Sequence, residues 1–569
     1  MEDRRRDELV QADLSMKGGF RPIPVIIANE VSERIVSASV TANLIIYLTE
    51  KYHLGAASSA IIVFIYQAAA NFLPVCGAVV SDALLGRYLM ITLTLFSCTL
   101  GTTMLFLTSV IPRLAPQDCG GLPNQSCDSA SPTPLQLFVL CASLGFMSLG
   151  ASGVRPCCLA FAEDQIAHWD SSRKDRALRG LFSWYYVSVG FAQIVAITVL
   201  VYIQDNMGWK IGFGVSAATM LFVTLVNLAA SPFYVKVKPQ KSIWVGLLQV
   251  PVVAFKNRHL ETHHGDQFHA ASGSAHSVPS EKMRFLNKAC ILRSHARCSM
   301  GSWSICTVEQ VENLKAAVSV MPMWSAMVMT SLIQTSSFGV LQAATMDRRI
   351  GTERFKLPAG SVSIFDIITF TIWSGCYDRY IVPFLRCITG RQQALTLKQR
   401  MGISVFLSSA SMVVASAVEN HRRRTAVRAE YLHLQQQISV LWLAPQYVLT
   451  GLSGALGAIG QIEFYYAVLP KSMGSFVLAL LFFGGGIASI LATLVVKIVN
   501  MVTGRNGMVP WLSNNLDEGH YDYYYALLAI FGAVDLIYFV VCAYVFDERP
   551  QNKSLQAGGD AQGMVELQG

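Results

Sequence analysis

The chain has 569 residues, of which 53% are hydrophobic and only 14% are charged. Soluble globular domains carry about 25% charged residues, so this composition excludes an ordinary soluble protein and predicts a polytopic membrane protein in a lipid bilayer. The net charge of +8 does not indicate a nucleic-acid partner, because Lys and Arg gather in particular loops, as membrane topology requires.

Twelve stretches approach the roughly 20 apolar residues that a membrane-spanning helix needs. They lie at 24–48, 58–82, 89–111, 135–160, 180–203, 211–233, 315–340, 360–385, 399–418, 438–467, 474–500 and 523–546. The eighth contains Asp366, and the ninth is short and followed by a basic run, His421–Arg424, in a predicted external loop. The polar first 20 residues do not predict a cleavable signal peptide.

An even number of spans puts both termini on one side, and the distribution of Lys and Arg predicts that this side is the cytosol. The longest polar segment, 234–314, separates six spans from six, and its stretch 242–258 predicts a helix along the membrane surface. We therefore expect a tail at 1–23, a six-helix half at 24–233, a cytosolic linker at 234–314, a second half at 315–546 and a tail at 547–569. Two six-helix halves around a central site resemble the major facilitator fold.

Among the ionisable residues inside predicted spans, four stand out: Glu30, Glu33 and Arg34 in the first, and Arg155 in the fourth. Charge at bilayer depth is costly and usually functional. Spacings of three and four put the first three on one side of a helix, and Arg34 lies ~15 Å into its span, near the midplane. Their charges sum to zero, so protonating one glutamate leaves a positive site suited to a small anion. This pattern predicts proton-coupled transport. The alternative is a purely structural role, in which the buried charges pair only to avoid the cost of desolvation.

The loop between spans 3 and 4 is predicted to be external. There Cys119 and Cys127 can form a disulfide, and Asn124 begins a glycosylation sequon. The remaining cysteines form no CxxC pattern, and the histidines of the linker are loosely spaced, so neither a metal site nor a cofactor is predicted.

The cytosolic end of span 2, Gly77–Arg87, reads GAVVSDALLGR and resembles the loop motif of the major facilitator superfamily. In that motif an aspartate and an arginine help to lock the inner gate, which implies this role for Asp82 and Arg87. Asp378 and Arg379, near the end of span 8, are the predicted counterpart in the second half.

Longer stretches resemble one family. The ExxER motif of the proton-coupled oligopeptide transporter family matches Glu30 to Arg34, and further segments resemble the plant nitrate and peptide transporters of that family across about residues 20–548. These segments are Asn43–Glu50, Ser81–Tyr88, Gly153–Cys157, Val201–Asp205, Phe285–Lys288, Trp303–Lys315 and Leu397–Gly402.

The resemblance implies proton symport by alternating access, with nitrate, small peptides or organic plant metabolites and hormones as substrates. It implies that Glu30, Glu33 and Arg34 couple protons to substrate and that a basic residue of span 4, usually lysine, pairs with them. Here that residue is Arg155, which can hold a planar carboxylate or nitrate with two hydrogen bonds, as lysine cannot. The usual location is the plasma membrane, with the vacuolar membrane as the alternative; the oligomeric state is not implied.

Departures from the family pattern bear on the substrate. Tyrosines that often follow ExxER are replaced by Ser37 and Ala38, and Gly454 stands where peptide carriers have a glutamate that holds the peptide ammonium. Its loss favours a small anion over a di- or tripeptide, and Gln334 aligns with a histidine associated with nitrate binding. Other candidates for substrate contact in the central region are Trp324, Phe338, Trp373 and Gln461.

The leading hypothesis is therefore a proton-coupled symporter of nitrate or an organic acid. The alternatives are a di- or tripeptide symporter and a substrate sensor with little net transport. An enzyme is not expected, because no GxSxG, HExxH or P-loop pattern occurs in a suitable context.

Overall fold

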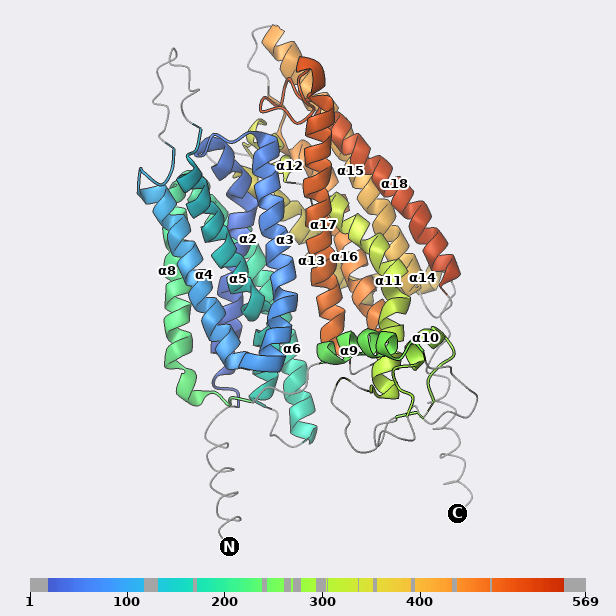
Figure 1. Cartoon of the computed structure of the whole chain (residues 1–569). Helices are drawn as coiled ribbons and strands as arrows, with labels where there is room; N and C mark the ends of the chain where they lie inside the picture. The colour runs from blue at the N-terminus through green and yellow to red at the C-terminus, as the bar shows by residue number, and fades with distance from the viewer. Residues whose placement is uncertain are drawn as a thin grey trace.

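The apolar runs of the sequence form long helices that pack side by side in a bundle (Figure 1). The computed structural model describes residues 19–546, apart from 117–130, 167–170, 238–242, 260–267, 270–277, 293–302, 304, 336, 351–355, 390–394, 432–436 and 471–472. Over these residues the only β-pairing consists of isolated bridges. A helix satisfies its own backbone hydrogen bonds, as hydrocarbon surroundings require.

We call the first group of helices the N-terminal half. It comprises α2 (Ile23–Glu50), α3 (Ala56–Val80), α4 (Arg87–Val110), α5 (Pro134–Asp164), α6 (Ser171–Val195), α7 (Val201–Asn206) and α8 (Trp209–Ala229). One π-helical turn, Ser81–Leu85, extends α3, and another, Ala196–Leu200, joins α6 to α7 in a continuous helix. The hydroxyl of Thr133 and the side chain of Gln136 form a capping box that starts α5.

We call the second group the C-terminal half. It comprises α11 (Val308–Gln334), α12 (Phe338–Ala344), α13 (Ile364–Cys376), α14 (Val382–Thr389), α15 (Leu397–Tyr431), α16 (Ala444–Val468), α17 (Gly474–Thr503) and α18 (Tyr521–Val545). A 3₁₀ turn, Ala359–Ser363, leads into α13, and a π-helical turn, Tyr377–Ile381, joins α13 to α14. A second capping box, between Thr307 and Gln310, starts α11.

Ten helical stretches of the described chain are long and apolar enough to cross a membrane. Two further helices, α2 with 28 residues and α16 with 25, have the length but carry charges or many glycines. They pack inside the bundle, α2 against α5, α6 and α8, and α16 against α13 and α15. Together they make the twelve predicted spans, so the predicted all-α architecture is confirmed.

The ninth span differs from its prediction, because it does not end at residue 418. Helix α15 has 35 residues, about 52 Å at 1.5 Å per residue, and thus exceeds the roughly 30 Å of hydrocarbon. The basic run therefore lies on a helix and not in a loop. Arg422 pairs with Glu419 at 2.8 Å and with Asp517 at 2.7 Å, and Arg423 donates to the carbonyl of Asp517. These pairs explain a cluster of positive charge on the predicted external side.

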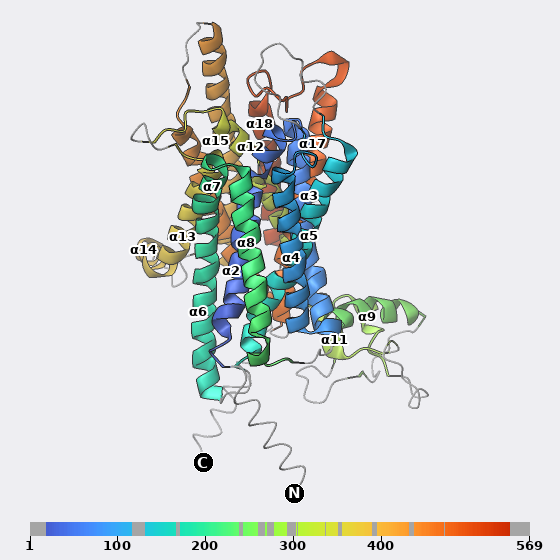
Figure 2. The ribbon, with the colours of Figure 1, turned by 90° about the vertical axis from the view of Figure 1, so that its left-hand side faces the viewer.

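In the sequence, α9 (Ile243–Lys256) and α10 (Arg284–Asn287) lie between the N-terminal and the C-terminal half. Figure 2 shows α9 near the lower end of the bundle, where it projects to one side at a large angle to the spanning helices. The helix predicted at 242–258 is present, and its place on a membrane surface stays a prediction. Apolar residues from α9, the following segment and the start of α11 form a small core that includes Cys290 and Cys306. Burial raises the pKa of both thiols to about 11.

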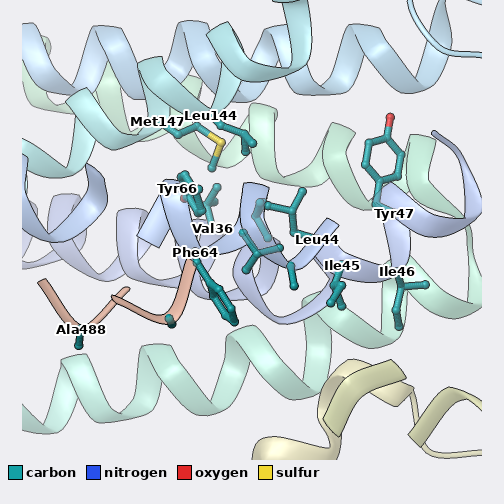
Figure 3. Close-up of a cluster of buried hydrophobic side chains, with 14 of the residues drawn as sticks. Val36, Leu44, Ile45, Ile46, Tyr47, Phe64, Tyr66, Leu144, Met147 and Ala488 are labelled. Atoms are coloured by element: carbon teal, nitrogen blue, oxygen red, sulfur yellow. The ribbon is translucent and has the colours of Figure 1, made fainter. Parts of the chain in front are cut away.

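The two halves meet along α3 and α17, which lie side by side (Figure 1). Figure 3 shows part of the buried apolar cluster around α2, with Val36 and Leu44 near Phe64 of α3. Ala488 of α17 belongs to the same cluster. The polar residues of α2 that are buried among the helices are Asn29, Glu30, Ser32, Glu33, Ser37, Ser39 and Asn43.

Candidate functional site

Glu30 is buried at the contact of α2 with α6. Its Oε1 accepts hydrogen bonds from the Tyr185 hydroxyl at 2.6 Å and from the Arg34 guanidinium at 3.2 Å. Its other oxygen, Oε2, is buried and accepts no hydrogen bond from any described residue. A buried oxygen without a donor is costly for a carboxylate, so Oε2 is the atom at which a proton would break no existing contact.

Glu33 lies one turn further along α2 and faces α5. Both of its carboxylate oxygens accept from Arg155, Oε2 from Nε at 3.1 Å and Oε1 from a terminal nitrogen at 2.9 Å. The same terminal nitrogen of Arg155 donates to the Ser37 hydroxyl at 2.9 Å, and that hydroxyl lies 3.2 Å from the Tyr66 hydroxyl. The spacing in the sequence predicts Glu30, Glu33 and Arg34 on one face of a helix. The structure brings them together with Arg155 in two neutral ion pairs, Glu30 with Arg34 and Glu33 with Arg155.

The two arginines differ in how far their donors are used. Arg155 is 10% exposed and its fork is occupied by Glu33 and Ser37, whereas Arg34 is 26% exposed and has one described carboxylate partner, Glu30. Sequence comparison favoured Arg155 as the group that grips an anion. In the structure the guanidinium of Arg155 is bound to Glu33. Arg34 is therefore the arginine that is more accessible to an anion from the cavity.

Both arginines line a cavity of about 420 Å³ between the halves. The N-terminal half contributes residues of α2, α3, α5 and α6, and the C-terminal half contributes residues in or next to α11, α12, α13, α15, α16 and α18. The wall is rich in polar side chains. The polar and charged side chains of the wall are Arg34, Ser37, Thr41, Gln67, Arg155, Gln193, Gln334, Ser337, Ser363, Asp366, Gln446, Tyr447, Thr450 and Tyr525.

The two glutamines among the predicted substrate contacts line two different cavities. Gln334 lines the cavity together with Arg155, and its amide donates to the Ser453 hydroxyl. Gln461 lines a second cavity of about 160 Å³ inside the C-terminal half, which also includes Gln334 and Gly454. The second cavity therefore shares one wall residue with the first.

The three predicted aromatic contacts lie away from the lining of the central cavity. Phe338 packs edge-on against Tyr521 and Tyr524 in a buried aromatic cluster. Trp324 donates its indole N–H to the carbonyl of Leu480, and Trp373 has Tyr377 as its described ring contact. Their contacts are those of helix packing, and a role in substrate binding stays a prediction.

At the predicted inner gate, Arg87 contacts both Asp82 and Asp164. Its Nε lies 3.9 Å from Asp82, but a terminal nitrogen lies 2.7 Å from Asp164 and also donates to the carbonyl of Ala160. The shorter pair ties the start of α4 to the end of α5, and the sequence motif did not reveal Asp164. Arg379 is exposed, and the side chain of Asp378 lies outside the described part of the structure.

Polar contacts also join the two halves at the predicted external end. Arg348, after α12, pairs with Asp205 at the end of α7 at 3.2 Å, and the hydroxyl of Ser361 donates to the carbonyl of Ile197. The backbone N–H of Ala56 donates to Asn514 at 3.1 Å. These residues come from segments far apart in the sequence, so no spacing rule could have paired them.

Three predicted features of the external loop, Cys119, Cys127 and Asn124, fall within 117–130 and lie outside the described residues. In the described chain, no cluster of three or more His, Cys, Asp or Glu side chains is arranged to hold a metal ion.

Comparisons with known proteins agree with the geometry. Residues 88–512 match the PTR2 family model, described as the POT family. The chain is 41% identical to Protein NRT1/ PTR FAMILY 1.2 of Arabidopsis thaliana over 547 residues, which cover 93% of this chain and 90% of that protein. It is also 41% identical to Protein NRT1/ PTR FAMILY 1.1 of the same plant, over 93% of this chain and 92% of that protein.

Solved structures share the fold. A crystal structure of an auto-inhibited POT family peptide transporter superposes with a TM-score of 0.67 at 16% identity, over 93% of this chain and 98% of that one. The in meso crystal structure of the POT family transporter PepTSo gives the same TM-score and identity, over 93% and 99%. These likenesses confirm the predicted major facilitator architecture.

Proposed function

The chain belongs to the POT family of membrane transporters, and on this premise we propose that it is a proton-coupled symporter of a small anionic substrate, nitrate or an organic acid. The membership makes it a multi-pass membrane protein and not an enzyme. The observation that carries the proposal is the pairing of two carboxylates with two arginines beside a polar cavity between the halves.

The proton enters this scheme at Glu30. Its Oε2 has no described donor, so protonation there breaks no hydrogen bond, whereas a proton on Glu33 would compete with the fork of Arg155. Neutralising Glu30 leaves Arg34 without its anionic partner beside the cavity. A buried charge that has lost its partner is unfavourable by about 3–5 kcal/mol, and a small anion at Arg34 restores neutrality.

Proton and anion therefore favour each other's binding, and this coupling is reciprocal by thermodynamic linkage. The cluster of two carboxylates and two arginines is neutral when empty, and it is neutral again when it holds one proton and one monovalent anion. The state with only one of the two ligands carries a net charge in a low-dielectric setting. In alternating access the loaded, neutral site opens first to one side of the membrane and then to the other. Contacts such as the pair of Arg348 with Asp205 close the external side.

Two-electrode recording in oocytes tests the proposal. Addition of the right substrate should give an inward current that grows as external pH falls, and Glu30→Gln should remove that pH dependence. Glu33→Gln should also impair coupling, because Arg155 then loses its bidentate partner. Substrate-induced currents that are equal at acid and neutral pH in the unmodified protein would refute proton coupling.

The alternatives make different predictions in the same cells. A sensor, suggested by Ser37, Ala38 and Gly454, would bind substrate without accumulating it. A di- or tripeptide symporter would give currents with peptides and none with nitrate or organic acids. We place the protein in the plasma membrane, with the vacuolar membrane as the alternative, and imaging of a fluorescent fusion in plant cells distinguishes the two.

A further inference from the structure

A buried carboxylate that the proton-coupling scheme does not use lies in α18. The described chain buries five carboxylic side chains almost completely: Glu30, Glu33, Glu419, Asp522 and Asp535. The first three pair with arginines, and Asp522 lies 3.6 Å from a ring nitrogen of His520. Asp535 is only 3% exposed and is the one of the five that has no basic side chain beside it among the described residues.

Asp535 lies at bilayer depth, far from the charged residues of the helices packed around it. At 1.5 Å per residue it is ~21 Å along α18 from Tyr521, the first residue of that helix. Helices α11 and α15 pack against α18. The charged residues of α11 lie in its first turns, so that Lys315 is ~22 Å before Thr330 along the helix, and α15 has no charged residue between 401 and 418. A carboxylate without a counter-ion is unfavourable at such a depth and is usually functional.

The described hydrogen-bond donor to Asp535 is a single hydroxyl. Its Oδ2 accepts from the Thr330 hydroxyl at 3.2 Å. The same hydroxyl lies 3.3 Å from the carbonyl oxygen of Ala326, so its one proton is shared between two acceptors. The structure describes no donor to Oδ1. A proton on Oδ1 would therefore remove the buried charge without breaking any described contact.

Thr330 also connects Asp535 with the central cavity. It lines the second cavity, of about 160 Å³, together with Ser404, Ser453 and Gln334. Gln334 lines the central cavity as well, and its amide donates to the Ser453 hydroxyl at 2.9 Å. The second cavity has room for several water molecules, and its wall offers hydroxyl and amide groups that water can bridge. Water and hydroxyl groups can thus relay a proton between the central cavity and Asp535.

The charge balance of transport gives this carboxylate a role. One proton on Glu30 and one monovalent anion cancel, so a cycle that carries only these two moves no net charge and gives no current. We propose that Asp535 is a second proton-binding site, so that each monovalent anion crosses the membrane with two protons. The inference rests on the proposed function, in which Glu30 takes the first proton.

The two protons then have different consequences. The proton on Glu30 sets how transport depends on external pH, because it frees Arg34 for the anion. The proton on Asp535 supplies the net charge that makes transport electrogenic. It enters and leaves through the central cavity, which alternating access opens to one side of the membrane at a time.

The test compares charge with uptake in the same voltage-clamped oocyte that expresses the full chain. The probes are isotope-labelled nitrate and isotope-labelled monocarboxylic acids, offered one at a time. In the unmodified protein one net positive charge should enter with each anion. Asp535→Asn keeps the shape of the side chain but cannot ionise. It should still take up the anion, with uptake that grows in acid, while the net charge per anion falls to zero.

Asp522→Asn is the matched control. It makes the same substitution at another buried carboxylate of α18, in the first turn of that helix, and Asp522 lines neither the central nor the second cavity. The control should keep one net charge per anion. Asp535→Glu restores a carboxyl group that can ionise, so it should return the charge that Asp535→Asn loses. Surface expression of each variant is measured by biotinylation.

The inference and the proposed function fail in different ways. Acid-stimulated uptake without current in the unmodified protein, or an unchanged charge per anion in Asp535→Asn, overturns the second site and leaves proton symport at Glu30 intact. The inference is also overturned if Asp366→Asn, and not Asp535→Asn, abolishes the charge, because the second proton then binds at the wall of the central cavity. If the charge depends on Asp535 but uptake is equal at every external pH, Asp535 stands and the role of Glu30 falls.

A loss of all uptake in Asp535→Asn is decided by Asp535→Glu. Uptake with one net charge per anion in Asp535→Glu supports the second site, because only a carboxyl group that ionises then sustains transport. Uptake without charge in that variant overturns it, and so does a failure to take up the anion.

Discussion

Replacing Arg155 by methionine tests the buried ion-pair network most sharply. The change removes both hydrogen bonds to Glu33 and the one to Ser37, at 3.1, 2.9 and 2.9 Å. The two charged side chains are only 10% and 1% exposed, so solvent screens their attraction little. Leaving one partner of such a pair alone destabilises a protein by about 3–5 kcal/mol.

The pH dependence of this loss has a definite sign. In Arg155→Met the folded chain holds Glu33 without a cation, whereas the unfolded chain exposes it to water. The folded variant therefore gains more from protonation than the unfolded one does, and its stability deficit is largest at neutral and alkaline pH and shrinks as pH falls. Arg155→Lys keeps the charge but loses the bidentate geometry, so it should lose less stability at every pH.

Thermal unfolding of the purified protein in detergent, recorded between acid and alkaline pH, measures this directly. The expected result is a lowered melting temperature for Arg155→Met that approaches the unmodified value in acid, with Arg155→Lys between the two. An equal loss at all pH values would mean that Glu33 is not left uncompensated, and the assigned pairing would then be wrong.

Four other outcomes follow from described contacts. Tyr185→Phe removes one donor to ionised Glu30, so the half-maximal current should move to higher pH; an unchanged profile would argue against Glu30 as the proton site. Arg422→Gln should lower the melting temperature, because it strands a buried carboxylate, and a variant as stable as the parent would contradict the pairing. Arg348→Gln should weaken the external closure by about 0.2–1 kcal/mol, which faster labelling of an engineered cavity cysteine would report. Cys290 and Cys306, buried with a raised pKa, should alkylate slowly at neutral pH; rapid labelling of both would contradict the small linker core.

The most informative positions in the sequence were charged residues inside otherwise apolar spans. Charge in apolar spans drew attention to Glu30, Glu33, Arg34 and Arg155, and helical periodicity placed the first three on one face. Their pairing partners were only partly predictable. Tyr185 is one of several aromatic residues in its span, and no spacing rule links α6 to a particular turn of α2.

Asp366 shows the opposite case. In the sequence, Asp366 only marks the eighth predicted span as one that contains a charge, and no role is predicted for it. Only the tertiary arrangement shows that it faces a cavity with two arginines. Gly454, read as the loss of a carboxylate, lies beside a different cavity, whereas Asp366 of α13 lines the central one.

The basic run after span 9 could not be interpreted from charge counts alone. Positive residues predict a cytosolic loop, and this rule assumes that each charge faces water near the membrane. Arg422 is instead buried, with Glu419 one turn away on the same helix and Asp517 nearly a hundred residues later. Charges that neutralise one another in the fold carry no topological signal.

The most direct test of the central claim is the external pH dependence of substrate-induced current in Glu30→Gln, compared with the unmodified protein at equal surface expression. Permanent neutrality at this position should leave Arg34 open to an anion at every pH, so the current should lose its rise in acid while substrate binding persists. A variant whose current still climbs as the bath is acidified would show that H⁺ is taken up elsewhere.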